Sequence, residues 1–217
     1  MRFQAVLFDF DGTLVDSEAL HYQSWMKVLA PYQVTYTEHD FCDEFSGVPT
    51  LKAAHILKER HQLVPSARDL CDEKNVVFVA TAAEVLPKLM YFAKQVVELT
   101  STRCPIALVT GSSKAEALPV LKHYRLLELF SVIVCKDDVE QPKPHPEPYR
   151  KALAALNIAP HEAVAIEDTC TGLTSAKEAG LTAVVVPNMH SNKQDLSLAD
   201  HSFTDLEAVF DWLCPER

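Results

Sequence analysis

Residues 5–18, AVLFDFDGTLVDSE, have the pattern of a buried strand that runs into an acidic turn and then into a helix. The first four residues are apolar and β-prone, and the run ends at Asp9 and Asp11. Asp16 or Ser17 can cap the helix, which continues with apolar residues at helical spacing. This segment therefore predicts a strand, a polar turn and a helix, in that order.

The segment from residue 17 to residue 87 has a helical pattern throughout. It contains no continuous β-type run, and its amphipathic stretches near residues 51–63 and 67–83 are bounded by glycine and proline. We therefore expect residues 17–87 to form an α-helical insertion placed just after the first strand.

Beyond residue 87 the pattern changes to short apolar runs that alternate with helix-compatible segments. The apolar runs lie at 106–109, 132–134, 163–166 and 183–186, and the helix-compatible segments at 114–124, 146–156 and 171–179. A last helix is expected from Thr204, with Thr204 and Glu207 as a capping box. The alternation predicts an α/β fold. We expect a doubly wound parallel sheet, built from residues 1–16 and 88–217, that carries an inserted α-helical cap at residues 17–87.

Composition and charge exclude several classes of protein. The chain has 217 residues, of which 48% are hydrophobic, so it can bury a large core. Its formal net charge of −10 disfavours binding to nucleic acid or an anionic membrane. No apolar run reaches the roughly 20 residues of a membrane span. Acidic residues interrupt the first apolar run, whereas the apolar region of a signal peptide contains none. Six cysteines without a CxxC pair fit a reducing compartment. We expect a monomeric cytoplasmic protein.

Polar residues follow the predicted strands, and together they form one chemically consistent set. In chain order they are Asp9, Asp11, Thr110, Gly111, Ser112, Lys143, Glu167 and Asp168. Ligands of open parallel sheets bind outside the carboxyl ends of the strands, so we expect these residues to lie together. They offer carboxylates for a hard cation, a hydroxyl and backbone amides for phosphate oxygens, and one ammonium group. Mg²⁺ fits this set, because it prefers a few carboxylates together with substrate phosphate and water.

The two acids after the first strand also suggest a reaction. With a cation in place, Asp9 could attack phosphorus in line and form an aspartyl phosphate, which divides the reaction into two easier steps. Asp11 could protonate the leaving alcohol and then take a proton from the attacking water. The residues alone therefore predict Mg²⁺-dependent phosphoryl transfer through Asp9.

The motifs that carry these residues resemble those of the haloacid dehalogenase superfamily. The run from Asp9 to Glu18, DFDGTLVDSE, looks like the first motif. VTGS at 109–112 looks like the second, KPHPE at 143–147 matches the third, and EDTCTG at 167–172 matches the fourth. The four motifs come in the order of the family and span nearly the whole chain.

This resemblance implies a role for each of the core residues. Catalysis is expected of Asp9, Asp11, Thr110 and Lys143, where the hydroxyl binds the transferring phosphoryl group and the lysine stabilises the phosphoaspartate. Substrate binding is expected of Gly111 and Ser112. The Mg²⁺ site is expected at Asp9, Asp11, Glu167 and Asp168, with Asp11 acting through its backbone carbonyl.

The insertion resembles the small helical cap of the β-phosphoglucomutase-like subgroup, which includes phosphatases of sugar phosphates. His21 and Lys74 stand where the mutases have histidine and lysine. The cap loop SGVPT at 46–50 lacks the lysine before glycine and the arginine three residues beyond it, with which mutases hold a second phosphate. The resemblance implies that His21, Gly47, Thr50 and Lys74 bind substrate, and that cap closure excludes water. The departure of the cap loop from the mutase pattern favours hydrolysis, since a mutase must rebind a bisphosphate intermediate. The expected substrate is a small phosphorylated metabolite, a sugar or polyol phosphate.

Other functions stay open at this point. A β-phosphoglucomutase-type mutase would share all four core motifs. A phospho-accepting signalling receiver also combines acids, a threonine and a lysine at strand ends, although it needs neither the helical insertion nor Asp11. A haloacid dehalogenase would not require Asp11 or the acidic fourth motif, so the sequence argues against that activity.

Overall fold

The computed structural model describes residues 1–84 and 86–215, and it divides into two compact units. One unit consists of Met1–Asp16 and Lys88–Arg217, and the other of Ser17–Pro87. Residue 85 of the predicted insertion and residues 216–217 of the predicted core lie outside the described residues. Each unit is considered by itself below.

The first unit is built on a six-stranded sheet in the order β5-β4-β1-β6-β7-β8, and every neighbouring pair is parallel. The strands are β1 (Ala5–Phe8), β4 (Ile106–Val109), β5 (Val132–Val134), β6 (Ala163–Glu167), β7 (Thr182–Val185) and β8 (His201–Ser202). The predicted α/β fold with a parallel sheet is confirmed. β1 lies in the middle of the sheet, paired with β4 on one side and β6 on the other.

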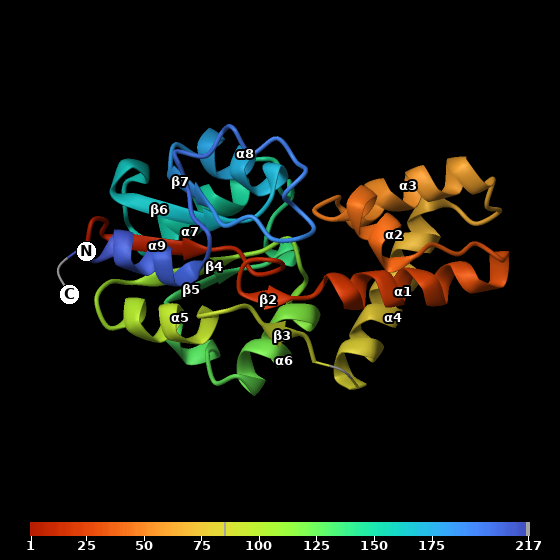
Figure 1. Ribbon diagram of the computed structural model, residues 1–217, viewed down its shortest axis with the longest axis horizontal. Coiled ribbons are helices and arrows are strands. Elements are labelled where there is room, and N and C mark those ends of the chain that lie inside the picture. The colour runs from red at the N-terminus through yellow and green to blue at the C-terminus, as the bar shows by residue number, and fades with distance from the viewer. Residues whose placement is uncertain (85, 216–217) are drawn as a thin grey trace. The chain divides into compact units, whose positions relative to one another are not determined.

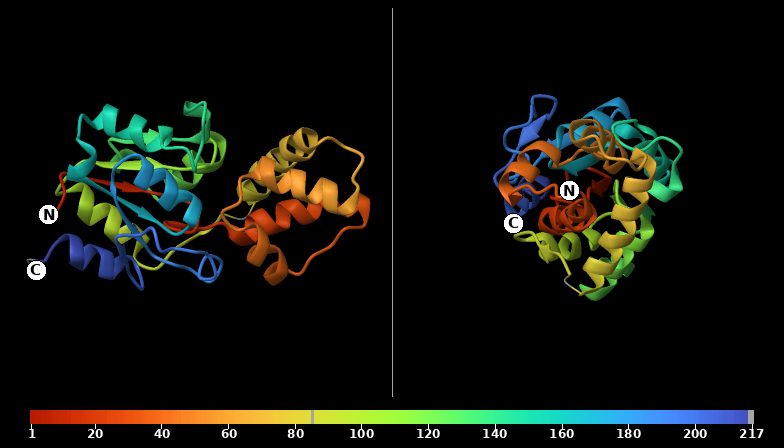
Figure 2. Two further views of the ribbon diagram at one scale, coloured as in Figure 1. Left: turned by 90° about the horizontal axis from the view of Figure 1, so that it is seen from above. Right: turned by 90° about the vertical axis from the view of Figure 1, so that its right-hand side faces the viewer.

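Helices cover both faces of this sheet (Figures 1 and 2). They are α5 (Ala93–Ser101), α6 (Lys114–His123), α7 (Glu147–Leu156), α8 (Cys170–Glu178) and α9 (Leu206–Leu213). Figure 1 shows α7 and α8 on one side of the sheet and α5 and α6 on the other, and α9 packs against α5. The core beneath α7 and α8 is apolar and fully buried, with Leu7 of β1 among its members. Because parallel strands are buried on both faces, β1 has no polar residue until it ends.

The second unit is a bundle of four helices: α1 (Glu18–Leu29), α2 (Glu38–Phe45), α3 (Thr50–His61) and α4 (Ala67–Glu84). Each helix contributes buried apolar residues to a separate core, which includes Trp25, Phe41, Leu57 and Leu70. None of the described helices is long and apolar enough to cross a bilayer. A short 3₁₀ turn follows α1 in this unit at Ala30–Tyr32, and the first unit contains others at Leu127–Leu129, Lys136–Asp138 and Pro160–Glu162.

The ends of some elements differ from the predictions. The last helix begins at Leu206, and its cap is Asp205, whose Oδ1 accepts a hydrogen bond from the Ala208 N–H at 2.8 Å. The predicted Thr204–Glu207 capping box is therefore wrong by one residue, and the Thr204 hydroxyl instead donates to Asp205. The unpredicted elements include the helix α5, the edge strand β8, and a small antiparallel pair formed by β2 (Val15–Asp16) and β3 (Lys88–Leu89).

Candidate functional site

The candidate site lies where the chain order in the sheet reverses. From β1 the chain adds β4 and β5 on one side, and it then returns to add β6, β7 and β8 on the other side. The carboxyl ends of β1, β4 and β6 therefore meet around this switch point, which is where ligands bind in open α/β sheets. Asp9 follows β1, Thr110 follows β4, and Glu167 is the last residue of β6.

A buried lysine joins the first of these acids to the last. Lys143 Nζ lies 2.6 Å from Asp9 Oδ1 and 2.6 Å from Glu167 Oε1. All three side chains are more than 90% buried. Lys143 comes from the proline-rich segment between β5 and α7, so residues of three separate segments form this ion-pair network. Charge-assisted hydrogen bonds of this length are among the strongest in proteins.

Burial also changes the proton affinities in this network. Burial, followed by repulsion from Glu167, raises the pKa of Asp9 from 3.8 to about 7, although Lys143 lowers it. Burial alone would lower the pKa of Lys143, but attraction to Asp9 and Glu167 raises it above the ordinary value. Lys143 is therefore a permanent cation. Ionisation of Asp9, by contrast, costs free energy in this buried site, and a nearby positive charge would reduce that free-energy cost.

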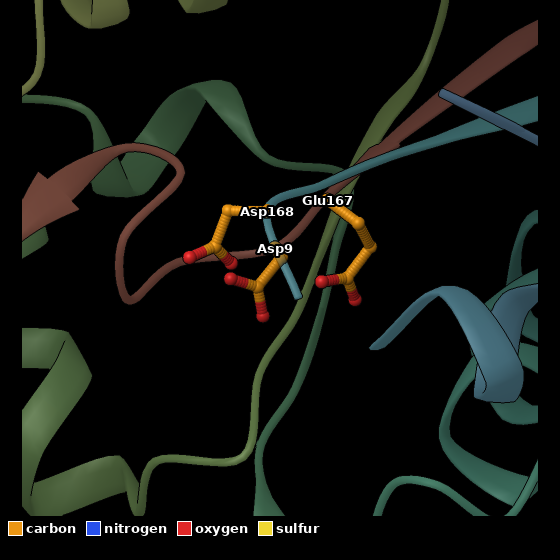
Figure 3. Close-up of side chains that lie close together, drawn as sticks. All are labelled: Asp9, Glu167 and Asp168. Carbon is orange, nitrogen blue, oxygen red and sulfur yellow. The ribbon is translucent and has the colours of Figure 1, made fainter. Parts of the chain in front are cut away.

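Asp168 completes a cluster of three buried acids (Figure 3). Asp9, Glu167 and Asp168 each offer a carboxylate oxygen, and these oxygens lie within 4.8 Å of one another. Three carboxylates against the single ammonium of Lys143 leave negative charge in excess. Hard oxygen ligands with excess negative charge suit a divalent cation such as Mg²⁺.

Glycine lets two of these carboxylates approach the backbone. A Cβ at Gly12, where φ is 81°, would lie 2.2 Å from Asp168 Oδ2. A Cβ at Gly172, in the first turn of α8, would lie 1.9 Å from Glu167 Oε2. Any larger residue at either place would push an acid out of the cluster, so the fourth motif needs its glycine for a steric reason.

We expect Gly172→Ala to destabilise the protein, although glycine to alanine ordinarily favours a helix. The added methyl group must displace the Glu167 carboxylate, so we expect a loss of about 1–3 kcal/mol, which is typical of overpacking. Urea denaturation in the presence of a chelator measures it. Gly111→Ala is the matched control, because a Cβ there meets nothing within 4 Å. Equal stability of the two variants would contradict this steric account.

The residues after β4 surround the side chain of Asp11. The hydroxyls of Thr110 and Ser112 lie 3.3 and 2.6 Å from Asp11 Oδ2. The Ser112 backbone N–H donates to Thr110 Oγ1 at 2.9 Å, which holds that hydroxyl in place. Gly111 lies between them and leaves open space beside its Cα. The structure thus brings together all eight core residues that the sequence singled out.

The four predicted cap residues belong to the helical unit. Lys74 is fully buried, and its Nζ lies 2.8 Å from His21 Nδ1. An ammonium group only donates, so His21 Nδ1 accepts in this contact. The His21 ring stacks on Phe78, with ring centroids 4.4 Å apart. Gly47, with φ 71°, precedes α3, and Thr50 is the first residue of that helix.

Two side chains outside the motifs hold the acids in place. The Tyr149 hydroxyl donates to Glu167 Oε1 at 2.6 Å, and burial raises the pKa of Tyr149 well above 10, so it keeps its proton. Asn188 Nδ2 donates to Asp168 Oδ2 at 2.8 Å. The sequence analysis missed both residues. Tyr149 carried a weak signal, since it is the polar residue on the face of α7 that supplies Ala152 and Leu153 to the core.

The chain is similar to known proteins in both sequence and structure. The chain matches the model of the haloacid dehalogenase-like hydrolases over residues 6–186. The phosphorylated carbohydrates phosphatase of Thermotoga maritima is 33% identical over 196 residues, which are 88% of each chain. A solved structure of a putative β-phosphoglucomutase from Thermotoga maritima is 30% identical, with a TM-score of 0.75 over 99% of this chain and 100% of that one. CbbY from Rhodobacter sphaeroides, solved in complex with phosphate, is 28% identical, with a TM-score of 0.79 over 94% of each chain.

Proposed function

Because the chain belongs to the family of haloacid dehalogenase-like hydrolases, we propose that it is a Mg²⁺-dependent phosphatase that hydrolyses a small phosphomonoester, a sugar or polyol phosphate. The observation that carries this proposal is the buried Asp9 carboxylate at the switch point of the sheet. It is joined to Lys143 on one side and lies within the three-acid cluster on the other. A carboxylate so placed can act as a nucleophile toward phosphorus.

The residues of the cluster fit a magnesium ion. Asp9 and Asp168 would provide carboxylate ligands, the backbone carbonyl of Asp11 would provide a third oxygen, and Glu167 would contribute through water. When bound, Mg²⁺ would neutralise the charge of the phosphate and so allow an anion to approach the carboxylates. The buried hydroxyls of Thr110 and Ser112, together with the backbone N–H of the exposed Gly111, would then hold phosphate oxygens.

The chain's own residues account for both steps of the reaction. A carboxylate oxygen of Asp9 attacks phosphorus while the bond to the ester oxygen breaks, and Asp11 gives its proton to the leaving alcohol. In the second step a water molecule attacks the phosphorus of phospho-Asp9, Asp11 takes the proton of that water, and inorganic phosphate leaves. Lys143, positively charged throughout, stabilises the negative charge that passes between Asp9 and the phosphoryl group.

The substrate class and the compartment rest on different observations. Sugar phosphates are favoured because the relative from Thermotoga maritima is a phosphatase of phosphorylated carbohydrates. We place the enzyme in the cytoplasm because all six cysteines are free thiols, as expected in a reducing compartment.

A phosphate-release screen tests the proposed function. Phosphorylated sugars and polyols are incubated with the enzyme and Mg²⁺, and released phosphate is measured. We expect at least one sugar or polyol phosphate to exceed a simple aryl phosphate in kcat/KM by about tenfold or more, a margin that about 1.4 kcal/mol of specific binding supplies. An excess of EDTA should abolish the activity, and added Mg²⁺ should restore it.

Other outcomes of the same screen would identify the rival functions. Interconversion of glucose 1-phosphate and glucose 6-phosphate with a bisphosphate primer, faster than phosphate release, would assign the chain as a mutase. Stable phosphorylation of the protein with no release of alcohol would favour a signalling receiver. A flat, feeble response to every sugar and polyol would overturn the substrate class.

A further inference from the structure

Asn188 connects two parts of the acidic cluster that are far apart in the sequence. It lies in the loop after β7, and its Nδ2 donates to Asp168 Oδ2 at 2.8 Å and to the Gly12 carbonyl oxygen at 3.1 Å. An amide nitrogen carries two N–H donors, so it can satisfy both acceptors at once. The side chain therefore ties the acid after β6 to the turn after β1.

The orientation of this amide is set by its own loop. Asn188 Oδ1 accepts hydrogen bonds from the backbone N–H groups of His190, at 2.8 Å, and Ser191, at 3.1 Å. The Asn188 backbone N–H donates to Oγ of Ser191, which is fully buried. Because the side-chain oxygen faces two donors, the nitrogen must face Asp168, and the reverse orientation would leave three acceptors facing one another.

A second contact fastens the same loop beside Asp168. Gln194 Oε1 accepts a hydrogen bond from the Cys170 backbone N–H at 2.9 Å. Cys170 is the first residue of α8, two positions after Asp168. The loop is thus attached to the fourth motif at two points, and Asn188 is the point that touches the carboxylate.

We propose that Asn188 is a positioning residue, which holds the Asp168 carboxylate in the orientation that binds the divalent cation. This inference rests on the proposed function, in which Asp168 is a metal ligand. Asp168 is repelled by the neighbouring Asp9 and Glu167, and an unrestrained carboxylate would turn away from them. A lysine at position 188 would also hold it, but would compete with the cation. A neutral amide fixes the carboxylate and leaves its charge for the metal.

Direct titration with Mn²⁺, followed by the electron paramagnetic resonance of the free ion, tests the role of Asn188 without reference to activity. Asn188→Leu keeps the branched shape of the side chain and removes both the amide donor that faces Asp168 and the amide oxygen that faces the loop. We expect its Kd for Mn²⁺ to rise by about tenfold or more, as for other residues that orient metal ligands. In phosphate-release assays the Mg²⁺ concentration for half-maximal rate should rise by a similar factor. At saturating Mg²⁺, kcat should return to within a few-fold of the wild-type value.

Ser191→Ala is the matched control, because it disturbs the same turn and leaves the Asn188 amide facing Asp168. It should bind Mn²⁺ as the wild type does. An equal weakening of Mn²⁺ binding in both variants would mean that only the loop fold matters, and would overturn the inference. So would an unchanged Kd in Asn188→Leu. Failure of the wild-type protein itself to bind Mn²⁺ would instead overturn the metal site of the proposed function, so the two failures are distinguishable.

Discussion

Asp9→Asn abolishes turnover and leaves the fold intact: this is the largest effect that we expect of any single substitution. The amide has nearly the same shape as the carboxylate, but it is not a nucleophile toward phosphorus. We expect kcat to fall by at least about a thousandfold, as when other enzymes lose their nucleophile. Phosphate release on the best substrate of the screen measures it. Acid-quenched wild-type enzyme should in addition carry a phosphoryl group on the peptide that contains Asp9.

The stability of the same variant provides an independent check. Burial and Glu167 raise the pKa of Asp9 to about 7, so the folded protein binds a proton there more tightly than the unfolded chain does. Ionisation of Asp9 therefore costs folding free energy as the pH rises from about 4 through 7 in the absence of metal. Asp9→Asn removes that cost, so its unfolding temperature in EDTA at pH 8 should not fall below that of the wild type.

Asp195→Asn, at an exposed loop position, is the control for the turnover measurement. Full activity of Asp9→Asn would defeat the proposed mechanism.

Lys143→Met is expected to have the second-largest effect, this time on stability as well as on activity. It leaves the carboxylates of Asp9 and Glu167 buried without their shared cation. Breaking a buried ion pair in this way costs about 3–5 kcal/mol. The cost should be smaller at pH 5.5 than at pH 8, because at the lower pH Asp9 can take up a proton in place of the lost charge. Urea denaturation in EDTA at the two pH values measures it.

A surface lysine offers the comparison for this experiment. Lys94 pairs with Glu98 along α5 at 3.7 Å, with side chains that are 44% and 48% exposed. Exposed pairs of this kind contribute about 0.3–0.5 kcal/mol, so Lys94→Met should be nearly neutral. Added Mg²⁺ should restore part of the stability of Lys143→Met, since it supplies positive charge to the same acids. A loss no greater than that of Lys94→Met would contradict the buried network.

Much of this molecule could be predicted from the sequence because its central strands are apolar on both faces. A run such as that of β4 has no polar residue until it ends, so both the strand and the first polar side chain beyond it stand out. The rule that parallel strands meet at their carboxyl ends then brings Asp9, Thr110 and Asp168 to one place. The order of the four motifs supplied the rest of the core site.

The errors have equally specific causes. Thr204 and Asp205 are both good helix caps, and the glutamate three residues after Thr204 favoured the wrong one. β2 and β3 have two residues each, which is too short for an alternating pattern to appear. Asn188 was missed because its contacts with Asp168 and Gly12 depend on how a polar loop folds back over the sheet, and nothing in the local sequence around it records that geometry.

The central place of β1 has a consequence for the order in which this protein forms. β1 leaves the ribosome before the other strands of its sheet, and both of its partners are encoded more than 90 residues later. The helical unit, whose core draws only on its own four helices, can be complete before β1 has any neighbour. A chain released before β6 would possess that unit and Asp9, but neither Glu167 nor Asp168. If the proposed metal site is right, the ability to bind a divalent cation is acquired late in synthesis, and tight cation binding reports that β1 has paired with its neighbours in the sheet.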